Sequence, residues 1–207
     1  MQNMVHPQYT TPPVEPLIEP KSAKGRILGV AARQFSDKGY EATTVRDLAA
    51  EIGILSGSIF HHFKSKEEIL YSLMLDVTIN MANTLQQAVS AAPTQLEKIR
   101  ALVQTELSFI HGPYGPAATV LVYEWRSLSK HYRTQILSHR DKYDQLWIQT
   151  LTQAKADGLT DIDAKILHQI IHGALAWTVN WYDPKGKLSL EGLSDTIVNL
   201  AVHHQVS

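Results

Sequence analysis

The chain has 207 residues, no cysteine and a formal net charge of −1. The lack of cysteine excludes disulfides, thiolate metal sites and thiol nucleophiles. At 44% hydrophobic residues, a chain of this length can bury a sizeable core. No apolar run reaches the roughly 18 residues of a membrane span, and no apolar signal region opens the sequence. We therefore expect a soluble cytoplasmic protein with one small and one larger module.

The charges are unevenly distributed along the chain. Residues 21–66 hold eight basic and four acidic side chains, whereas residues 67–207 hold eleven basic and fourteen acidic ones. The near-neutral total thus conceals a positive module close to the N-terminus. A positive charge confined to one module favours nucleic-acid binding by that module.

The first segment, residues 1–20, contains five of the nine prolines and shows little periodicity. It is predicted to be a flexible, Pro-rich arm. A helix is predicted next, over residues 22–36, because apolar residues recur there at three- and four-residue steps. Its buried stripe consists of Ile27, Leu28, Ala31 and Phe35. Gly39 ends this section.

Residues 43–66 predict two short helices joined by a tight turn. The Thr43 and Thr44 hydroxyls are placed to cap the first helix, whose outer face carries Arg46. Gly53 lies where that helix must stop, because glycine tolerates the positive φ of a helix C-terminus. This is the layout of a helix-turn-helix.

The second helix is predicted to start after a Ser56 cap and to run to about Phe63. Leu55, Ile59 and Phe63 are its predicted core residues. The outward face would hold Ser56, Gly57, Ser58, Phe60, His61 and His62. These small donors, imidazoles and one aromatic ring suit the edges of bases. Lys64 and Lys66 follow, where ammonium groups can reach phosphate oxygens.

Residues 22–72 closely resemble the TetR family of bacterial repressors. The matching positions are Phe35, Gly39, Tyr40, Thr44, Gly53, Ser58, Ile59, His62, Phe63, Lys66, Glu67 and Leu70. The resemblance implies that the second helix enters the major groove and that Thr44 and Lys66 bind phosphates. Phe60 occupies a position that is commonly tyrosine, so one phosphate contact of the family is missing. The predicted DNA-binding residues are Thr44, Arg46, Ser56, Gly57, Ser58, Phe60, His61, His62 and Lys66.

The remaining chain, residues 67–207, is predicted to be a helical ligand-binding and dimerisation domain. A long helix capped by Ser65 runs to about residue 92, and another begins at Pro93 with an apolar stripe that includes Leu96. Further helices are predicted over residues 117–127, 130–157, 161–181 and 190–204. No segment alternates strictly as a half-buried strand does. The sequence therefore predicts an all-α fold of about nine helices.

Two features of residues 120–147 point to a ligand. Arg140 interrupts an otherwise apolar stripe, which is costly unless the charge is paired. It could pair with Asp144, Glu106 or Glu124, or it could bind an anionic group of a ligand. Residues 123–129 and 140–143 also resemble the C-terminal modules of TetR regulators that respond to coenzyme A thioesters. The resemblance implies an acyl-CoA or other amphipathic acid bound by Trp125, Arg126, Arg140, Tyr143 and Trp147.

His168 and His172 stand one helical turn apart, but no glutamate lies between them as in a zinc-binding helix motif. We predict no metal and no cofactor. The last two long helices are apolar enough to pair with a second copy of themselves. The family resemblance implies that they form a four-helix dimer interface. This dimer would place two helix-turn-helix units about 34–36 Å apart on DNA.

These features favour a homodimeric, ligand-responsive repressor that binds a palindromic operator and is released by a small effector. A transcriptional activator with the same helix-turn-helix is an alternative that the sequence leaves open. One alternative is a helical adaptor without sequence-specific DNA binding. Another is an enzyme that uses the C-terminal aromatic residues, although the sequence has no Gly-x-Ser-x-Gly elbow and no phosphate-binding glycine loop. We therefore expect no enzymatic activity.

Overall fold

The computed structural model describes residues 18–202, so most of the predicted Pro-rich arm lies outside the described residues. Within that range the chain forms nine α-helices and two 3-10 helices and no strand, which confirms the all-α prediction. The elements are α1 Ala23–Lys38, α2 Val45–Ile52, α3 Ser56–Ile59, α4 Lys66–Ala91, α5 Gln95–His111, α6 Gly115–Tyr123, η1 Trp125–Ser127, α7 Lys130–Ala156, α8 Ala164–Trp177, η2 Thr178–Asn180 and α9 Leu190–Ala201.

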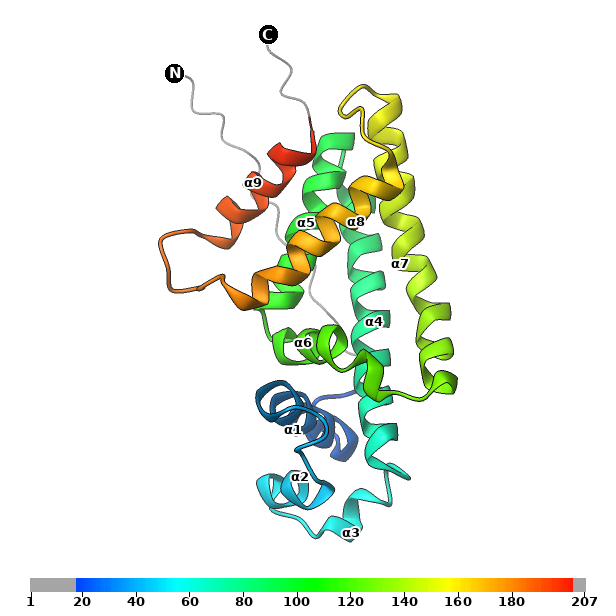
Figure 1. Ribbon diagram of the computed structural model, residues 1–207, viewed down its shortest axis with the longest axis vertical. Helices are drawn as coiled ribbons and strands as arrows, with labels where there is room; N and C mark the ends of the chain where they lie inside the picture. The colour runs from blue at the N-terminus through cyan, green and yellow to red at the C-terminus, as the bar shows by residue number, and fades with distance from the viewer. Residues whose placement is uncertain (1–17, 203–207) are drawn as a thin grey trace.

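Helices α1, α2 and α3 form a small head at one end of the molecule (Figure 1). Helix α4 starts in the head and runs into the body, where α5 and α7 pack along it. Helix α8 packs on α7 and α5, and α9 packs on α5. Helix α6 contacts α1, so the body reaches the head by a second route besides α4.

Local signals in the sequence determine where α2 starts and where it ends. Thr44 caps α2 by accepting from the Asp47 amide, and the Asp47 carboxylate accepts from the Thr44 amide in return. Gly53 ends α2 at φ 79° and ψ 34°, the left-handed conformation that glycine adopts at low cost. The Ile54 amide then donates to the Ala49 carbonyl. The predictions for Thr44 and Gly53 are confirmed, whereas Thr43 is buried and its hydroxyl donates to the Gly39 carbonyl instead of capping α2.

The core of the head continues into the body. Phe35, Leu48 and Ile59 are almost fully buried, and Leu70 of α4 and Val120 of α6 belong to the same cluster. A displacement of α6 therefore changes packing that the head depends on.

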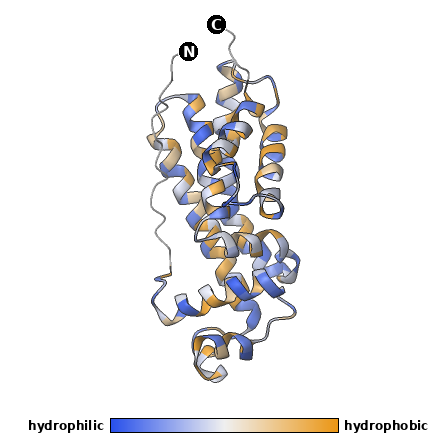
Figure 2. Ribbon diagram, turned by 90° about the vertical axis from the view of Figure 1, so that its left-hand side faces the viewer, coloured by the Kyte–Doolittle hydropathy of each residue, from blue (hydrophilic) through white to orange (hydrophobic). Residues whose placement is uncertain are grey.

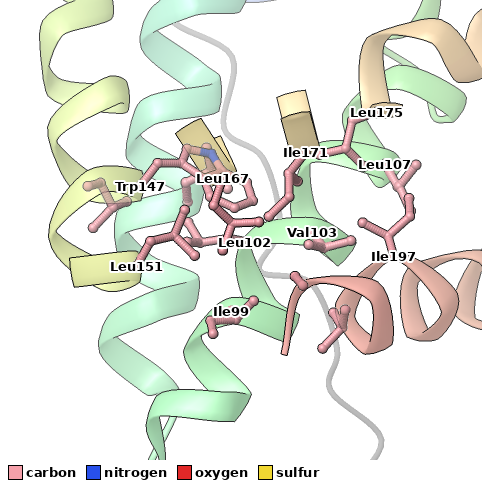
Figure 3. Packing of buried hydrophobic residues seen from close by; sticks show 14 of the residues in the cluster. Ile99, Leu102, Val103, Leu107, Trp147, Leu151, Leu167, Ile171, Leu175 and Ile197 are labelled. Carbon is pink, nitrogen blue, oxygen red and sulfur yellow. The ribbon is translucent and has the colours of Figure 1, made fainter. Parts of the chain in front are cut away.

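The core of the body is built mainly by α4, α5, α7, α8 and α9, and Figure 3 shows part of it. Trp147 lies at its centre and is completely buried, among Leu102, Leu151 and Leu167. Hydrophilic residues interrupt the hydrophobic ones along the helices (Figure 2). No helix among residues 18–202 is both long and apolar enough to cross a membrane.

Several predicted boundaries are wrong by a few residues, because hydrogen-bonding side chains near the helix ends decide them. Helix α5 begins after Thr94, which forms a capping box with Glu97, so Pro93 precedes the helix. Leu96 is 37% exposed and does not belong to the buried stripe. Asp163 caps α8, which therefore starts three residues later than predicted. The helix predicted over residues 117–127 is interrupted at Glu124, and α9 ends at Ala201.

Candidate functional site

The second helix of the head is shorter than predicted. Helix α3 spans only Ser56–Ile59, and residues 60–62 continue as turns in which the His61 amide donates to the Ser58 carbonyl. Its N-cap is Leu55, which makes no side-chain cap, so the prediction that Ser56 caps the helix is wrong. One extended residue, Leu55, separates the turn after Gly53 from α3. The helix therefore begins at Ser56, one residue earlier than predicted.

Leu55 is 80% exposed, so its predicted place in the core is also wrong. Ile54 is half-buried and packs on the core of the head. Ile54 takes the inward position beside the turn, so the Leu55 side chain is directed to solvent. Ile59 and Phe63 are buried as predicted. Leu55 thereby joins the outer face of the head as an apolar group that the sequence had not indicated.

The predicted DNA-binding residues come together on the outer surface of the head. Thr44, Arg46, Gly57, Phe60 and His61 are exposed. Ser56, Ser58 and His62 are half-buried. A Cβ built on Gly57 would meet no atom within 4 Å, so the space above it is open to an approaching surface. The groups that these residues offer are hydroxyls, imidazoles, one aromatic ring and the Arg46 guanidinium.

Lys66, predicted to bind phosphate, already has partners within the head. Its ammonium donates to the carbonyls of Tyr40 and Thr43, both at 2.9 Å, and lies 4.1 Å from the centroid of the Tyr40 ring. Burial, followed by the charges of nearby glutamates, raises the pKa of Tyr40 to about 12. Lys66 thus ties the start of α4 to the loop before α2. Its predicted phosphate contact would have to use its remaining N–H donor.

A cavity of about 320 Å³ lies in the body, between α4, α5, α6, α7 and α8. Its wall is mostly apolar. The larger apolar lining residues are Met81, Ile110, Leu121, Val122, Trp125 and Ile136. This volume is at the lower end of the range found for small-molecule sites.

The polar groups of this cavity converge at one pole. Glu106 of α5 is 2% exposed and accepts from the Tyr143 hydroxyl at 2.7 Å. The other Glu106 oxygen lies 3.0 Å from His172 Nδ1. Arg140 reaches the opposite ring nitrogen of His172 at 3.5 Å. Four groups from three helices therefore share one end of an otherwise apolar space.

Burial and the neighbouring carboxylate set the protonation of this pole. Burial, followed by the charge of Glu106, raises the pKa of Tyr143 well above its ordinary value, so its hydroxyl stays a donor. The hydrogen bond to Glu106 raises the pKa of His172 above 6.5. Burial lowers the pKa of His168, the neighbouring histidine on α8.

Arg140 pairs loosely within its own helix, because its Nε lies 3.8 Å from the Asp144 carboxylate. Its side chain is 39% exposed and lines the cavity. A weak pair of this kind leaves the guanidinium with donors to spare. Both interpretations of Arg140 in the sequence, the internal ion pair and the ligand contact, are compatible with this geometry.

The structure brings only three of the five predicted ligand residues to the cavity: Trp125, Arg140 and Tyr143. Arg126 is exposed and does not line it. Trp147 does not line it either, because this residue is fully buried and stacks on His168. No pattern in the sequence indicated that His172 binds an effector, and Glu106 was predicted only as one possible partner of Arg140.

The cavity and the head meet at the turn between α6 and η1. Trp125 lines the cavity, and the preceding residue, Glu124, accepts from the Tyr40 backbone amide at 3.0 Å. The second Glu124 oxygen accepts from Ser127, which holds the carboxylate in place. Glu67 of α4 accepts from the Ser129 amide, which joins the start of α4 to the start of α7.

Helix α8 carries an apolar stripe that no other part of residues 18–202 covers. Ile166 and Ile170 are each 58% exposed, and Trp177 is 63% exposed. Gly173 and Ala174 lie between them on the same face, and a Cβ on Gly173 would meet nothing within 4 Å. Leu200 of α9 is 79% exposed. A surface of this kind is typical of a protein–protein contact.

A second hollow of about 660 Å³ lies between α1 and the body helices α4, α5 and α6. Its border includes Ile18, the first described residue. Among residues 18–202, no three His, Asp or Glu side chains are placed to hold a metal ion. We therefore take the cavity with the polar pole as the candidate ligand site.

A helix-turn-helix head joined to a helical body with its own cavity defines a DNA-binding transcriptional regulator. The profile of the bacterial regulatory proteins of the tetR family matches residues 27–73. That of the tetracyclin repressor-like C-terminal domain matches residues 92–204. The chain belongs to the TetR family.

Similar proteins agree with this assignment. The transcriptional repressor KstR2 of Mycolicibacterium smegmatis is 34% identical over 178 residues, 84% of this chain and 85% of that protein. The structure of the ketosteroid transcriptional regulator KstR2 of Mycobacterium tuberculosis has a TM-score of 0.80 at 26% identity and covers 93% of this chain and 100% of that one. The structure of the superantigen PfiT has a TM-score of 0.76 at 44% identity, over 89% and 98%.

The two profiles and the KstR2 relatives are those of transcriptional regulators, not of enzymes. The enzyme alternative is thereby set aside, and so is the adaptor without sequence-specific DNA binding.

Proposed function

We propose that the protein is a homodimeric repressor that binds a palindromic operator and is released when a small amphipathic effector enters the body cavity. The observation that carries this proposal is the position of the cavity. Its wall residue Trp125 directly follows Glu124, whose carboxylate holds the Tyr40 amide of the head. An effector that prefers the non-binding arrangement by about 1–3 kcal/mol would weaken operator binding roughly 5- to 150-fold.

Residues 21–66 serve as the DNA-binding domain and residues 67–207 as the ligand-binding and dimerisation domain. Helix α3 and the turn after it enter the major groove. His61, Phe60 and Leu55 lie exposed there and are available to base edges and thymine methyl groups. Thr44, Arg46 and Lys66 lie at the edges, towards the phosphates. Because its target is operator DNA, we place its action in the bacterial cytoplasm.

The effector we propose is an acyl-CoA or another amphipathic acid. The apolar wall takes the hydrocarbon part, and Arg140 binds the anionic part through its free donors. A cavity of about 320 Å³ encloses an acyl group and leaves a coenzyme A moiety outside. The KstR2 relatives, one of them described as a ketosteroid regulator, fit an apolar ligand body.

The dimer forms through α8 and α9. The apolar stripe of Ile166, Ile170 and Trp177, together with Leu200, is exposed within the described part of the subunit. A two-fold axis through this face would pair each stripe with its own copy and present two heads to successive half-sites.

A selection of genomic fragments by the purified protein tests this function. We expect enrichment of a palindromic sequence, with binding that weakens steeply as salt rises because phosphate contacts release counterions. Adding a mixture of acyl-CoA and fatty acids should reduce operator binding. Equal binding to random duplex and to every selected fragment would end the repressor proposal.

Replacing His61 with Ala should flatten discrimination at particular base pairs, because a base contact is worth about 1–3 kcal/mol. Lys64→Ala should instead weaken all duplexes alike, because Lys64 is exposed and we expect its ammonium to contact phosphates, which carry no sequence information. Competition titrations against single-base variants of the selected operator measure both effects. An equal loss on every sequence from both variants would contradict this division.

Arg140→Ala should reduce effector retention at least about tenfold, because a charge-assisted hydrogen bond contributes roughly 1.5–3 kcal/mol. Native mass spectrometry of the protein from cells fed fatty acids gives the readout. Arg126→Ala is the matched control, since Arg126 is exposed and does not line the cavity, and it should retain the adduct as the unchanged protein does. If Arg140→Ala retains the effector as well as the unchanged protein does, Arg140 does not bind the anionic group of the effector.

A further inference from the structure

The hydrogen bonds at the pole of the cavity assign the proton positions on His172. The Tyr143 hydroxyl donates to one oxygen of Glu106, and His172 Nδ1 lies 3.0 Å from the other. A carboxylate only accepts, so His172 Nδ1 must be the donor of that bond. Tyr143 Oη, whose own proton goes to Glu106, also lies 3.0 Å from Nδ1 and acts as a second acceptor. The Nδ1 proton is therefore fixed, and Nε2 is the nitrogen that gains or loses a proton.

His172 Nε2 faces a cation. Arg140 Nη2 lies 3.5 Å from it, a long contact in which the neutral nitrogen accepts from the guanidinium. Protonation of Nε2 turns it into a donor directed at another donor, and the two positive groups then repel each other. An anionic oxygen between them would remove the repulsion and accept from both. His172 is 31% exposed and Arg140 is 39% exposed, and both line the cavity, so this space is open to a ligand.

We propose that His172 Nε2 and Arg140 together form a proton-coupled binding site for the anionic oxygen group of the effector, either a carboxylate or a phosphate. This inference rests on the proposed function only in taking the body cavity as the effector site. The ligand binds as an anion, and His172 takes up one proton as it does so. Glu106 and Tyr143 act as positioning residues, because they hold the ring by Nδ1 and leave Nε2 for the ligand.

The charged and titratable groups around His172 come from three helices. Glu106 stands on α5, Arg140, Tyr143 and Asp144 on α7, and His168 on α8. The hydrogen bond and the charge of Glu106 raise the pKa of His172 above 6.5 in the ligand-free protein, as does Asp144 more weakly, whereas burial and Arg140 lower it. An anion at Nε2 adds a further favourable charge, so it raises the pKa again.

The sign of the pH dependence follows from these two shifts. Above the pKa of the bound state, His172 is neutral with and without ligand, and affinity is at its lower plateau. As the pH falls towards the pKa of the free state, affinity rises by up to about tenfold per pH unit, the limit for one proton. Below the pKa of the free state, the histidine is charged throughout and affinity levels off.

The test uses three probes with the same eight-carbon chain: octanoic acid, octanoyl-CoA and 1-octanol. Calorimetry between pH 5.5 and pH 8.5, in buffers of different ionisation enthalpy, counts the protons taken up. We expect proton uptake with at least one of the two anionic probes and none with the alcohol. Uptake with octanoic acid alone identifies a carboxylate site, and uptake with octanoyl-CoA alone identifies a phosphate site.

His172→Asn is the informative variant, because the Asn amide can still donate to Glu106 while nothing remains at the position of Nε2. It should bind the anionic probe more weakly at low pH and lose the proton uptake. His131→Asn is the control, since His131 is exposed and bonded only to Gln135 of its own helix. It should behave like the unchanged protein. Histidine NMR of the unchanged protein, which needs no variant, should show the pKa of His172 rising when the anionic probe binds.

Anion binding without proton uptake, or with uptake that persists in His172→Asn, would overturn this inference and leave the proposed effector site standing. If neither anionic probe binds at any pH, the inference and the proposed effector class fail together. In that case displacement of the protein from the operator by another ligand would still support a ligand-responsive repressor.

Discussion

Ile170→Glu is expected to reduce operator affinity by at least about a hundredfold, because loss of the dimer leaves one reading head where specific binding needs two. Specific sites are typically bound about 10³ to 10⁷ times more tightly than non-specific DNA, and much of that margin is lost with one half-site. Ile170 lies in the middle of the uncovered stripe of α8, so a carboxylate there would be buried without a partner in the dimer. Analytical ultracentrifugation should show a monomer, and operator titrations give the affinity.

The fold of the subunit should survive this change, since the Ile170 side chain is 58% exposed within the subunit. Leu137→Glu is a matched control on α7, where the leucine is 46% exposed. It should remain a dimer and bind the operator as before. A dimeric Ile170→Glu protein, or a monomeric Leu137→Glu protein, would place the interface elsewhere.

Trp147→Ala is expected to lower the free energy of unfolding by about 3–5 kcal/mol, the usual cost of removing a large aromatic side chain from a core. Trp147 has no exposed surface and is packed between α5, α7 and α8 (Figure 3). For a chain of this size the melting temperature should fall by roughly 6–20 °C. Thermal melts at a fixed protomer concentration measure it, because dimerisation contributes to the observed stability.

Trp125→Ala separates a residue of the cavity wall from a residue of the core. Trp125 is half-buried and lines the cavity, so its removal should weaken effector binding and reduce stability much less than Trp147→Ala does. The reverse pattern, a stable Trp147→Ala protein with impaired ligand binding, would restore the role that the sequence indicated for Trp147.

Local signals in the sequence were enough to predict the helices of the head and most of the body. Thr44 and Gly53 act within one turn of their own positions, so the start and end of α2 could be located from neighbouring residues alone. The orientation of the Leu55 side chain could not be predicted in this way, because it depends on the number of extended residues between the turn and α3. Hydrophobic periodicity alone could not distinguish an apolar residue that faces inward from one that the turn directs to solvent.

The ligand site was harder to predict, because its parts are distant in sequence. Trp147 and Tyr143 share one inward stripe of α7, yet only Tyr143 lines the cavity, since His168 of α8 covers Trp147. The bond between Glu106 and His172 joins residues 66 positions apart. No local pattern distinguishes such a pair from two separate polar residues. The interrupted apolar stripe of α7 indicated Arg140, and the family resemblance added Trp125 and Tyr143, but neither indicated that His172 lies beside them.

The turn at Glu124 and Trp125 also has an evolutionary consequence. Glu124 accepts a hydrogen bond from the head, and the next residue, Trp125, lines the ligand site. A substitution at this turn would therefore alter both effector selectivity and the orientation of the head. Descendants that acquire a new effector should therefore change the walls of the cavity on α4 and α8, for example at Met81 or Ala176, and preserve this turn. Among close relatives, we expect the fewest amino-acid substitutions at Glu124 and Trp125, where contact with the head and contact with the effector fall on adjacent residues.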